Sequence, residues 1–249
     1  MSNSHDFLPS PRYGVDAPAF PALTGAVGVA CCLAATRWPL SRRGRATTAA
    51  VGAAVLASTG VYLHTTLRGK LRFWERELNR IGLKGGEQLL DLGCGRGMVL
   101  TAAATRLPKG RAHGVDLWTG DQSGNNPEAT LANCAAAGVA ARVEVHTADM
   151  TELPFEDASF DVVTSAMAIH NIPSREARRS AVDEAMRVLR PGGQLVVADL
   201  WWALKDYTAH LGHGTLRPLG PGYWYGGPWF AVTLFRVVKE SAPTGEEPC

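Results

Sequence analysis

The chain has 249 residues, of which 19% are charged and 46% are hydrophobic, and this balance excludes a largely disordered protein. The length is enough for one large α/β domain, or for one domain with an appendage. The formal net charge of +2 is too small to indicate a nucleic-acid-binding protein, so no nucleic-acid partner is expected. Five cysteines without a CxxC pair argue against a disulfide framework and a cysteine zinc site.

Two uncharged apolar stretches, residues 19–36 and 46–67, follow an N-terminal segment formed by residues 1–18. As helices they would extend about 27 and 33 Å, close to the ~30 Å hydrocarbon core of a bilayer. Their small residues suit close helix–helix contact, and the basic linker between them carries Trp38, a residue type common at membrane interfaces. We therefore expect a two-helix transmembrane hairpin over residues 19–67.

Three other interpretations of these stretches remain open, and one is a shallow hairpin that never crosses the bilayer and keeps its linker arginines at the headgroups. The stretches could instead be a pair of helices of a soluble core, packed on the main domain. A cleaved signal peptide fits the sequence less well, because the first eleven residues contain no Lys or Arg to form a basic n-region. A second apolar stretch also follows the first, and a signal peptide alone does not account for it.

The composition changes at residue 68, where an amphipathic helix is expected to run to residue 86 and to end in glycines. The expected strands after it are 88–93, 111–117, 142–149, 160–167, 193–200 and a final β-rich run, 229–239. The expected helices between them are 97–106, 126–137 and 174–190. This alternation predicts a Rossmann-like α/β domain over residues 68–240, with a parallel sheet covered on both faces. Residues 241–249 are expected to be a flexible tail.

The sequence LLDLGCGRG, residues 89–97, lies directly between an expected strand and an expected helix. Its glycines permit a tight turn and close approach of a ligand to the backbone, beside the unpaired N–H groups of a helix N-terminus. Such a turn alone is a weak signal, but Asp91 precedes it, and a carboxylate there suits a positively charged amine better than a pyrophosphate. The dinucleotide pattern GxGxxG fails as well, because its third glycine, counted from Gly93, falls on Met98.

Two further acids end the next two expected strands. Asp116 ends the second strand, about twenty residues after the glycines, where an acidic side chain binds ribose hydroxyls in α/β folds. Asp149 ends the third strand. Any one of these acids could be a helix cap or a turn residue, but the three together mark the sheet edge where open α/β proteins bind ligands.

At these residues the chain resembles the class I S-adenosylmethionine-dependent methyltransferases. The matching segments are LLDLGCGRG, GVDLW, TADMTELPFEDASFDVV, SAMAIHNI and VLRPGGQLVVADL, which together cover roughly residues 85–200. The resemblance implies a methyltransferase with a seven-stranded sheet, in which the run 229–239 is the last, antiparallel strand. It also implies S-adenosyl-L-methionine as the cofactor.

The resemblance assigns cofactor contacts to particular residues of this chain. These are Asp91, Gly93, Cys94 and Gly95 for the methionine part, Asp116 for the ribose, Leu117, Asp149 and Met150 for the adenine, and Ser165 at the end of the fourth strand. The whole chain also resembles a bacterial subgroup that begins with a segment like YGVDAP, residues 13–18, followed by an apolar hairpin. No inserted acceptor-binding domain is present, so residues 201–228 and the N-terminal segment are left to shape the acceptor pocket.

His170 and Asn171 follow the fourth strand, where the resemblance puts the reacting methyl group, and they are the catalytic candidates. A histidine there can remove the acceptor's proton, although it could instead only order its loop or stack on a ligand. His210 and His213 have no supporting carboxylate or cysteine pattern, so no metal is expected.

The expected function is methyl transfer to a small or lipid-like acceptor at the membrane. Two alternatives are a dinucleotide-dependent oxidoreductase and an inactive methyltransferase-like scaffold. The positive-inside rule barely decides the orientation of the hairpin, because five basic residues lie on its domain side and four lie in the linker. Because S-adenosylmethionine is a cytosolic metabolite, we expect a membrane protein whose catalytic domain faces the cytoplasm.

Overall fold

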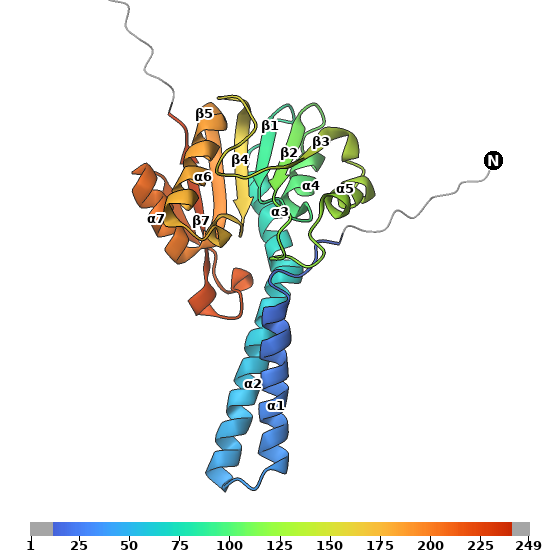
Figure 1. Ribbon diagram of the computed structural model, residues 1–249, viewed down its shortest axis with the longest axis vertical. Helices are drawn as coiled ribbons and strands as arrows, with labels where there is room; N and C mark the ends of the chain where they lie inside the picture. The colour runs from blue at the N-terminus through green and yellow to red at the C-terminus, as the bar shows by residue number, and fades with distance from the viewer. Residues whose placement is uncertain (1–11, 241–249) are drawn as a thin grey trace, which may run out of the picture.

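A computed structural model describes residues 12–240, and the predicted tail, 241–249, lies outside the described residues. Figure 1 shows an α/β domain from which two long helices project side by side, away from the sheet. The two helices are α1 (Ala19–Arg37) and α2 (Arg42–His64). The side chain of Ser41 caps the start of α2 by accepting a hydrogen bond from the backbone N–H of Gly44, at 3.1 Å.

The hairpin is held together by small residues and leaves much of its apolar surface open. A Cβ atom on Gly28 would lie 2.8 Å from Leu56 Cγ, and one on Gly52 would lie 2.7 Å from Cys32 Sγ, so glycine permits this close approach. Exposed apolar side chains occur along both helices: Leu23, Val27, Val29, Leu33, Val51 and Leu56. Both helices are long and apolar enough to cross a bilayer, a property that core helices and signal sequences share. In each helix, 17% of the most apolar 18-residue window is buried.

The second hairpin helix continues into the domain without a break. A π-helical turn, η1 (Thr65–Gly69), joins α2 to α3 (Lys70–Ile81), so the composition change at residue 68 is not a break in the helix. The helix ends in a glycine, as predicted, but it does so at Gly82, which has a left-handed backbone (φ 78°), and not at residue 86. Trp74 and Leu78 of α3 are buried against the sheet layer and anchor the hairpin to the core.

The seven-stranded sheet predicted from the sequence is confirmed. Its strands are β1 (Gln88–Leu92), β2 (Arg111–Asp116), β3 (Val143–Thr147), β4 (Phe160–Ala166), β5 (Leu189–Leu200), β6 (Thr215–Pro218) and β7 (Val232–Val238). They lie in the order β3-β2-β1-β4-β5-β7-β6, and the first five are parallel. The predicted antiparallel run forms β7, which pairs with both β5 and β6. β6 is the strand that the sequence did not predict.

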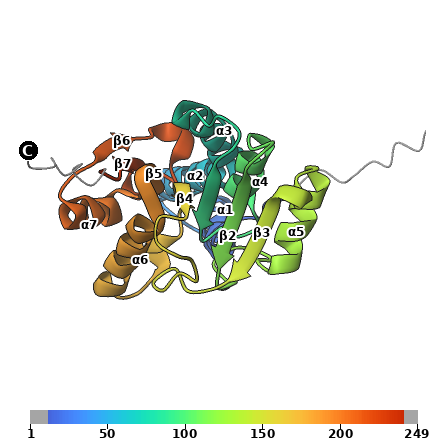
Figure 2. The same ribbon diagram turned by 90° about the horizontal axis from the view of Figure 1, so that it is seen from above.

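Helices cover both faces of the sheet, as Figure 2 shows. On one face lie α3, α4 (Met98–Thr105) and α5 (Pro127–Ala136), and on the other lie α6 (Arg175–Val188) and α7 (Trp201–Leu211). The predicted helix 174–190 ends two residues early because β5 begins at Leu189, and α7 was not predicted. The carboxyl ends of the parallel strands point toward the hairpin, so the edge that binds ligands in such folds faces α1 and α2 (Figure 1).

Candidate functional site

A cavity lies at the carboxyl ends of β1, β2, β4 and β5, where the strand order reverses between β1 and β4. In open parallel sheets this reversal is the usual place for a ligand. The cavity walls come from the glycine-rich turn after β1, the loop after β2, the turn after β4, the segment before α1 and the segment before β7. Residues far apart in the sequence therefore meet at one site.

Asp91 lies at the bottom of this cavity and is 1% exposed. Its Oδ1 accepts a hydrogen bond from Thr164 Oγ1 at 2.8 Å. Burial raises the pKa of Asp91 to about 7, and the hydrogen bond from Thr164 only partly offsets that effect. A buried carboxyl group whose hydrogen-bond partner is neutral is suited to binding a cation, because a positive charge favours its ionised form.

The glycine-rich turn folds tightly around the end of β2. The backbone N–H groups of Gly93 and Cys94 both donate to the carbonyl oxygen of Val115, at 2.8 and 3.1 Å. Gly93 has a φ of 65°, and a Cβ atom on it would lie 2.2 Å from Ala168 Cβ, so this position requires glycine. Cys94 is buried in the cavity wall, and burial raises the pKa of its thiol well above its ordinary value, so it is a neutral packing group.

Asp116 is held in a fixed orientation at the end of β2. Its Oδ2 accepts from the backbone N–H of Gly95 at 2.8 Å, and its Oδ1 accepts from that of Trp118 at 2.6 Å. A carboxylate has about four lone-pair sites, so it can still accept hydroxyl groups of a ligand. Asn125 lies beside it in the cavity wall, and its Oδ1 is buried without a hydrogen-bond partner. An unsatisfied buried acceptor next to a carboxylate favours a ligand that carries hydroxyl donors.

Four of the predicted cofactor residues lie outside the cavity lining. Leu117 is 54% exposed, and Asp149 is also exposed, with its Oδ1 accepting from the backbone and the hydroxyl of Thr151. Met150 is half-buried. Ser165 is fully buried, and its hydroxyl donates to the carbonyl oxygen of Leu92 at 3.0 Å, which ties β4 to β1. Their predicted contacts with a cofactor stay predictions.

His170 forms a close pair with a buried acid. It lies in the short helix η3 (Ile169–Asn171) after β4, and its Nδ1 is 2.6 Å from Oδ1 of Asp199 at the end of β5. Burial alone lowers the pKa of His170, but the negative charge of Asp199, whose Oδ1 is 2.6 Å away, outweighs it, so the pKa is raised. Because Asp199 engages Nδ1, Nε2 is the nitrogen left to accept a proton. Asn171 also lines the cavity, where its side chain donates to Asp121 at 3.0 Å.

The segment before α1 closes one side of the cavity through Asp16. Lys70, which is 4% exposed, donates to both carboxylate oxygens of Asp16, at 2.6 and 2.8 Å. Tyr225 and Gln122 also donate to this carboxylate, at 2.6 and 3.1 Å. Burial alone raises the pKa of Asp16, but the Lys70 ammonium and the hydrogen bonds outweigh it, so the pKa is lowered. Asp16 is therefore a partly exposed anion, with 21% of its side chain accessible, that holds three other segments of the chain together.

Backbone contacts of Asp16 extend this network from the hairpin to the glycine-rich turn. Its N–H donates to Thr66 Oγ1 at 2.9 Å, and its carbonyl oxygen accepts from the Tyr62 hydroxyl at 2.7 Å. Gln122 pairs with it as an isolated β-bridge, and Gln122 Oε1 accepts from the backbone N–H of Arg96 at 2.8 Å. The root of the hairpin is thereby connected to the N-terminus of α4, beside the cavity.

The opposite side of the cavity is aromatic and lies at the root of the hairpin. The rings that line it are Phe20, Tyr62, Tyr223, Tyr225 and Phe230. The ring centroids of Phe20 and Tyr62 are 5.2 Å apart, and those of Phe20 and Phe230 are 6.0 Å apart in an edge-to-face arrangement. The cavity thus has a polar half over β1 and β2, an aromatic half at the hairpin, and His170 in its lining.

Several of these cavity residues were not identified from the sequence. They are Asp16, Lys70, Gln122 and Asn125, and Asp199, which lies behind His170 outside the cavity lining, was not identified either. The sequence contained a signal for some of them, because YGVDAP and GDQSGNN are both dense in residues that are typical of binding loops. His210 and His213 do not meet: His210 Nε2 lies 2.8 Å from Asp183 Oδ1, and His213 Nδ1 lies 2.9 Å from the carbonyl oxygen of Leu211.

The middle of the chain is similar to known methyltransferases. Residues 90–197 match the protein family described as a methyltransferase domain. The 27-O-demethylrifamycin SV methyltransferase of Amycolatopsis mediterranei is 36% identical over 153 residues, which cover 61% of this chain and 52% of that protein. The ubiquinone/menaquinone biosynthesis C-methyltransferase of Geotalea daltonii is 32% identical over 143 residues, 57% of this chain and 58% of that one. The chain therefore spans about half the length of the curated relatives it matches.

Solved structures share the fold at lower sequence identity. The geranyl diphosphate C-methyltransferase of Streptomyces coelicolor, in complex with Mg²⁺, geranyl diphosphate and S-adenosyl-L-homocysteine, is 16% identical, with a TM-score of 0.56 over 69% of this chain and 81% of that chain. The YcgJ protein of Bacillus subtilis is also 16% identical, with a TM-score of 0.53 over 69% of this chain and 99% of that chain. These likenesses show the Rossmann-like methyltransferase fold.

Proposed function

We propose that this chain, whose residues 90–197 are a methyltransferase domain, transfers a methyl group from S-adenosyl-L-methionine to a small or lipid-like acceptor at the membrane. The observation that carries the proposal is the single cavity that joins two buried carboxyl groups, the His170–Asp199 pair and an aromatic wall. An inactive scaffold would not need the carboxyl groups and the histidine to line one cavity.

The polar half of the cavity fits the chemistry of the cofactor. Asp91 would bind its ammonium group, which provides the positive charge that the buried carboxyl group lacks. Asp116 would accept hydrogen bonds from the ribose hydroxyls, and a hydroxyl donor would also satisfy Asn125 Oδ1. When bound, the cofactor supplies a methyl group on a positively charged sulfur. Leu117, Asp149 and Met150 remain the residues proposed for the adenine end.

His170 is the proposed general base. Its Nε2 takes the proton from an acceptor O–H or N–H group while the acceptor atom forms its bond to the methyl carbon. Held by Asp91 and Asp116, the cofactor would supply the methyl group, and the electron pair of the broken carbon–sulfur bond would stay on its sulfur. Asp199 holds the ring in place and stabilises the imidazolium that forms. Close contact and alignment of the two reactants within the cavity supply much of the rate enhancement.

The aromatic half supports an acceptor that arrives from an apolar phase. Phe20, Tyr62 and Phe230 line the cavity where the hairpin leaves the domain. A hairpin inserted in a membrane would therefore place this side of the cavity at the membrane surface. Trp229 nearby in the chain is 62% exposed, and tryptophan is enriched at membrane–water interfaces. We propose a hairpin that spans the membrane, with the linker residues 37–45 outside and the catalytic domain facing the cytoplasm.

Removal of either carboxyl group is expected to weaken cofactor binding. Asp91→Ala and Asp116→Ala should each lower the affinity for S-adenosyl-L-homocysteine by about 1.5–3 kcal/mol, because each removes hydrogen bonds to a charged group. Isothermal titration calorimetry measures the loss, and Asp183→Ala, at an exposed carboxylate of α6 outside the cavity lining, is the control that should bind as the wild type does. S-adenosyl-L-homocysteine should also raise the melting temperature of the wild-type protein, whereas NAD⁺ should not. Unchanged affinity in a folded Asp91→Ala variant would contradict the proposed function.

Cofactor binding is expected to depend on pH through Asp91. The pKa of this carboxyl group is raised from its ordinary value to about 7 in the ligand-free cavity, and an ammonium group binds its ionised form. Affinity should therefore be highest above pH 7 and should fall about tenfold for each pH unit below it. Calorimetry with S-adenosyl-L-homocysteine between pH 5.5 and 8 tests this, at roughly half-unit steps. Asp91→Asn should bind weakly with a much flatter profile, and an equal slope in that variant would assign the dependence to another group.

The wild-type chain is expected to sediment with membranes and to resist extraction with alkaline carbonate. Val27→Lys and Val51→Lys place charges near the middle of α1 and α2, where both valines are exposed, and each charge should cost about 2.5–3.5 kcal/mol in a bilayer. The double variant should shift to the soluble fraction. Leu131→Lys, at an exposed leucine of α5, is the matched control and should stay with the membranes. A wild-type protein that is monodisperse without detergent would contradict the hairpin assignment.

A further inference from the structure

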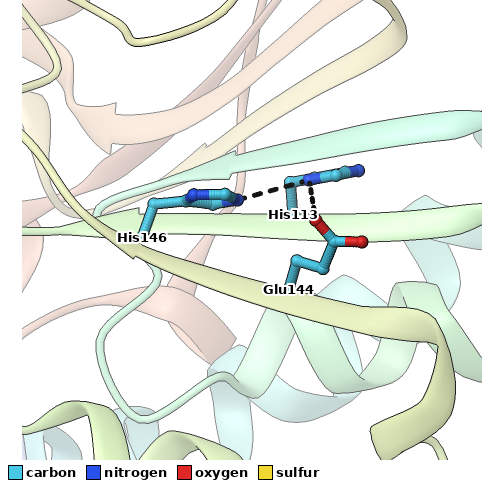
Figure 3. Close-up of side chains that lie close together, drawn as sticks. All are labelled: His113, Glu144 and His146. Carbon is cyan, nitrogen blue, oxygen red and sulfur yellow. Dashed lines mark hydrogen bonds and ion pairs between the residues drawn. The ribbon is translucent and has the colours of Figure 1, made fainter.

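Two histidines and a glutamate lie together on the sheet, at its β3 edge and away from the cavity lining. His113 is in β2, and Glu144 and His146 are in β3, with His113 directly opposite Glu144 in the parallel register. Glu144 and His146 are two residues apart on one strand, so their side chains point to the same face. Figure 3 shows the two imidazole rings end to end, with the carboxylate beside His113.

We propose that His113, Glu144 and His146 form a binding site for a divalent transition-metal ion, for which Zn²⁺ is the best fit. His113 Nδ1 lies 3.4 Å from His146 Nε2 and 3.7 Å from Glu144 Oε2, and the three ligand atoms all lie within 4.8 Å of one another. Zn–N bonds of 2.0–2.1 Å at tetrahedral angles place neighbouring donor atoms about 3.3 Å apart. The side chains already have nearly this spacing, so small rotations bring them onto one ion.

The chemistry of the three ligands also favours zinc. Two imidazoles and one carboxylate are a common set for Zn²⁺ with a fourth position open to water. Arg111 Nη1 lies 2.6 Å from Glu144 Oε1, which leaves the other carboxylate oxygen, Oε2, facing His113. Arg111 thus orients the carboxylate without covering the oxygen that would bind the ion. Glu144 is 45% exposed, so the ion can enter from solvent.

Aromatic rings hold the two imidazoles in place. The ring of Phe155 packs edge-to-face on His113 and His146, with centroids 5.9 and 5.1 Å away. Phe160 packs on His113 in the same manner, with centroids 5.3 Å apart. Rings fixed by packing lose little freedom when they bind an ion, and an apolar shell strengthens the electrostatic attraction between the ion and its ligands.

The ion would fasten the edge of the sheet. β3 has a neighbouring strand on one side only, and the site bridges it to β2 independently of the backbone hydrogen bonds. The sequence predicted no metal because His210 and His213, which are close in sequence, lack supporting ligands. His113 and His146 are 33 residues apart and meet only through the β2–β3 pairing. Because none of the three residues lines the cavity, the site is separate from the proposed methyl-transfer chemistry.

Zinc binding to the full chain in detergent tests the proposal. After treatment with a chelator and its removal, equilibrium dialysis against ZnCl₂ should give one Zn²⁺ per chain, and Zn²⁺ should raise the melting temperature. Glu144→Gln and His146→Gln should each weaken binding by more than about tenfold, since even an outer-shell partner of a metal costs that much when removed. The matched control is His213→Gln, at an exposed histidine outside the cluster, and it should bind as the wild type does.

Co²⁺ provides a second readout of the same ligands. The Co²⁺ form should show the visible absorption of a tetrahedral site without the thiolate bands that cysteine ligands produce, and this spectrum should be lost in Glu144→Gln and His146→Gln. Both variants should keep the far-ultraviolet circular dichroism and the S-adenosyl-L-homocysteine affinity of the wild type, so a loss of fold is recognised separately. Absence of stoichiometric Zn²⁺, or wild-type Zn²⁺ affinity in both variants, would overturn the proposal.

Discussion

The variant His170→Ala is expected to transfer methyl groups about 10²–10⁴-fold more slowly than the wild-type protein, which is the usual contribution of a general base. Its affinity for S-adenosyl-L-homocysteine should change little, because Asp91 and Asp116, the carboxyl groups proposed to bind the cofactor, lie on other strands. The measurement is the initial rate of transfer of a radiolabelled methyl group from S-adenosyl-L-methionine into a total bacterial lipid extract. His213→Ala serves as the control because His213 is exposed and does not line the cavity.

The acid next to His170 gives this prediction a pH signature. A base acts in its deprotonated form, so the rate should rise as the pH passes through the pKa of His170. This pKa lies above its ordinary value, because the effect of Asp199 outweighs that of burial. Asp199→Asn removes the charge that raises this pKa, and the acidic limb of the profile should therefore move to lower pH. An unchanged rate in His170→Ala would mean that the histidine only orders its loop.

Asp16→Asn is expected to destabilise the folded protein by about 3–5 kcal/mol, because it leaves the Lys70 ammonium buried without a counter-charge. For a chain of this size such a loss should lower the melting temperature by roughly 6–20 °C. Differential scanning calorimetry of the full chain in detergent measures it. Glu75→Gln makes the same chemical change at an exposed carboxylate paired with Arg106, and it should cost less than about 1 kcal/mol.

The pH dependence of the Asp16 effect follows from the direction of its pKa. The pKa of Asp16 is lowered in the folded state, so its contribution to stability is present above the ordinary carboxyl pKa of about 3.9 and is lost as the pH falls through the lower, folded value. The difference in melting temperature between wild type and Asp16→Asn should therefore be largest near neutral pH and should shrink in acid. Replacing both partners, as in Asp16→Leu with Lys70→Met, should recover much of the loss, because two apolar side chains leave no unpaired charge.

The ligand edge of the sheet was predictable because its signals are local. Asp91 and Asp116 stand at the end of strands whose apolar runs and following glycines or loops are visible within ten residues. The strand–turn–helix order around Gly93 and Gly95 can likewise be predicted from consecutive residues. Both carboxyl groups and both glycines line the cavity, as that local pattern indicates.

Asp16 could not be assigned in this way, because its partners come from distant parts of the chain. Lys70 is 54 residues away, Gln122 is 106 residues away and Tyr225 is 209 residues away. No periodicity or spacing relates such positions, and only the folded chain brings them together. The same holds for Asp199, which meets His170 because β4 and β5 are neighbours and end side by side.

Two elements of the domain escaped prediction for a different reason. β6 has four residues, all exposed, and it ends at Pro218 on the edge of the sheet, so it lacks the alternation that marks a half-buried strand. α7 begins with Trp201 and Trp202, whose exposed rings hide the helical pattern of the buried Ala203, Leu204 and Tyr207. In both cases the tertiary neighbours, rather than the local sequence, decide the structure.

The helical path from Arg42 to Ile81 contains no loop at which the hairpin could swing. At its π-helical turn, Thr65 donates to the carbonyl oxygen of Trp224 at 2.6 Å, and a Cβ atom on Gly69 would lie 2.3 Å from the carbonyl oxygen of Gly222, so this turn is also clamped from the side. With the hairpin in a bilayer, the domain would be held at a fixed distance from the membrane surface and at a fixed tilt. Only acceptors whose reactive atom reaches that distance from the membrane surface would meet His170, and lipids would then be selected by the position of that atom as well as by its chemistry.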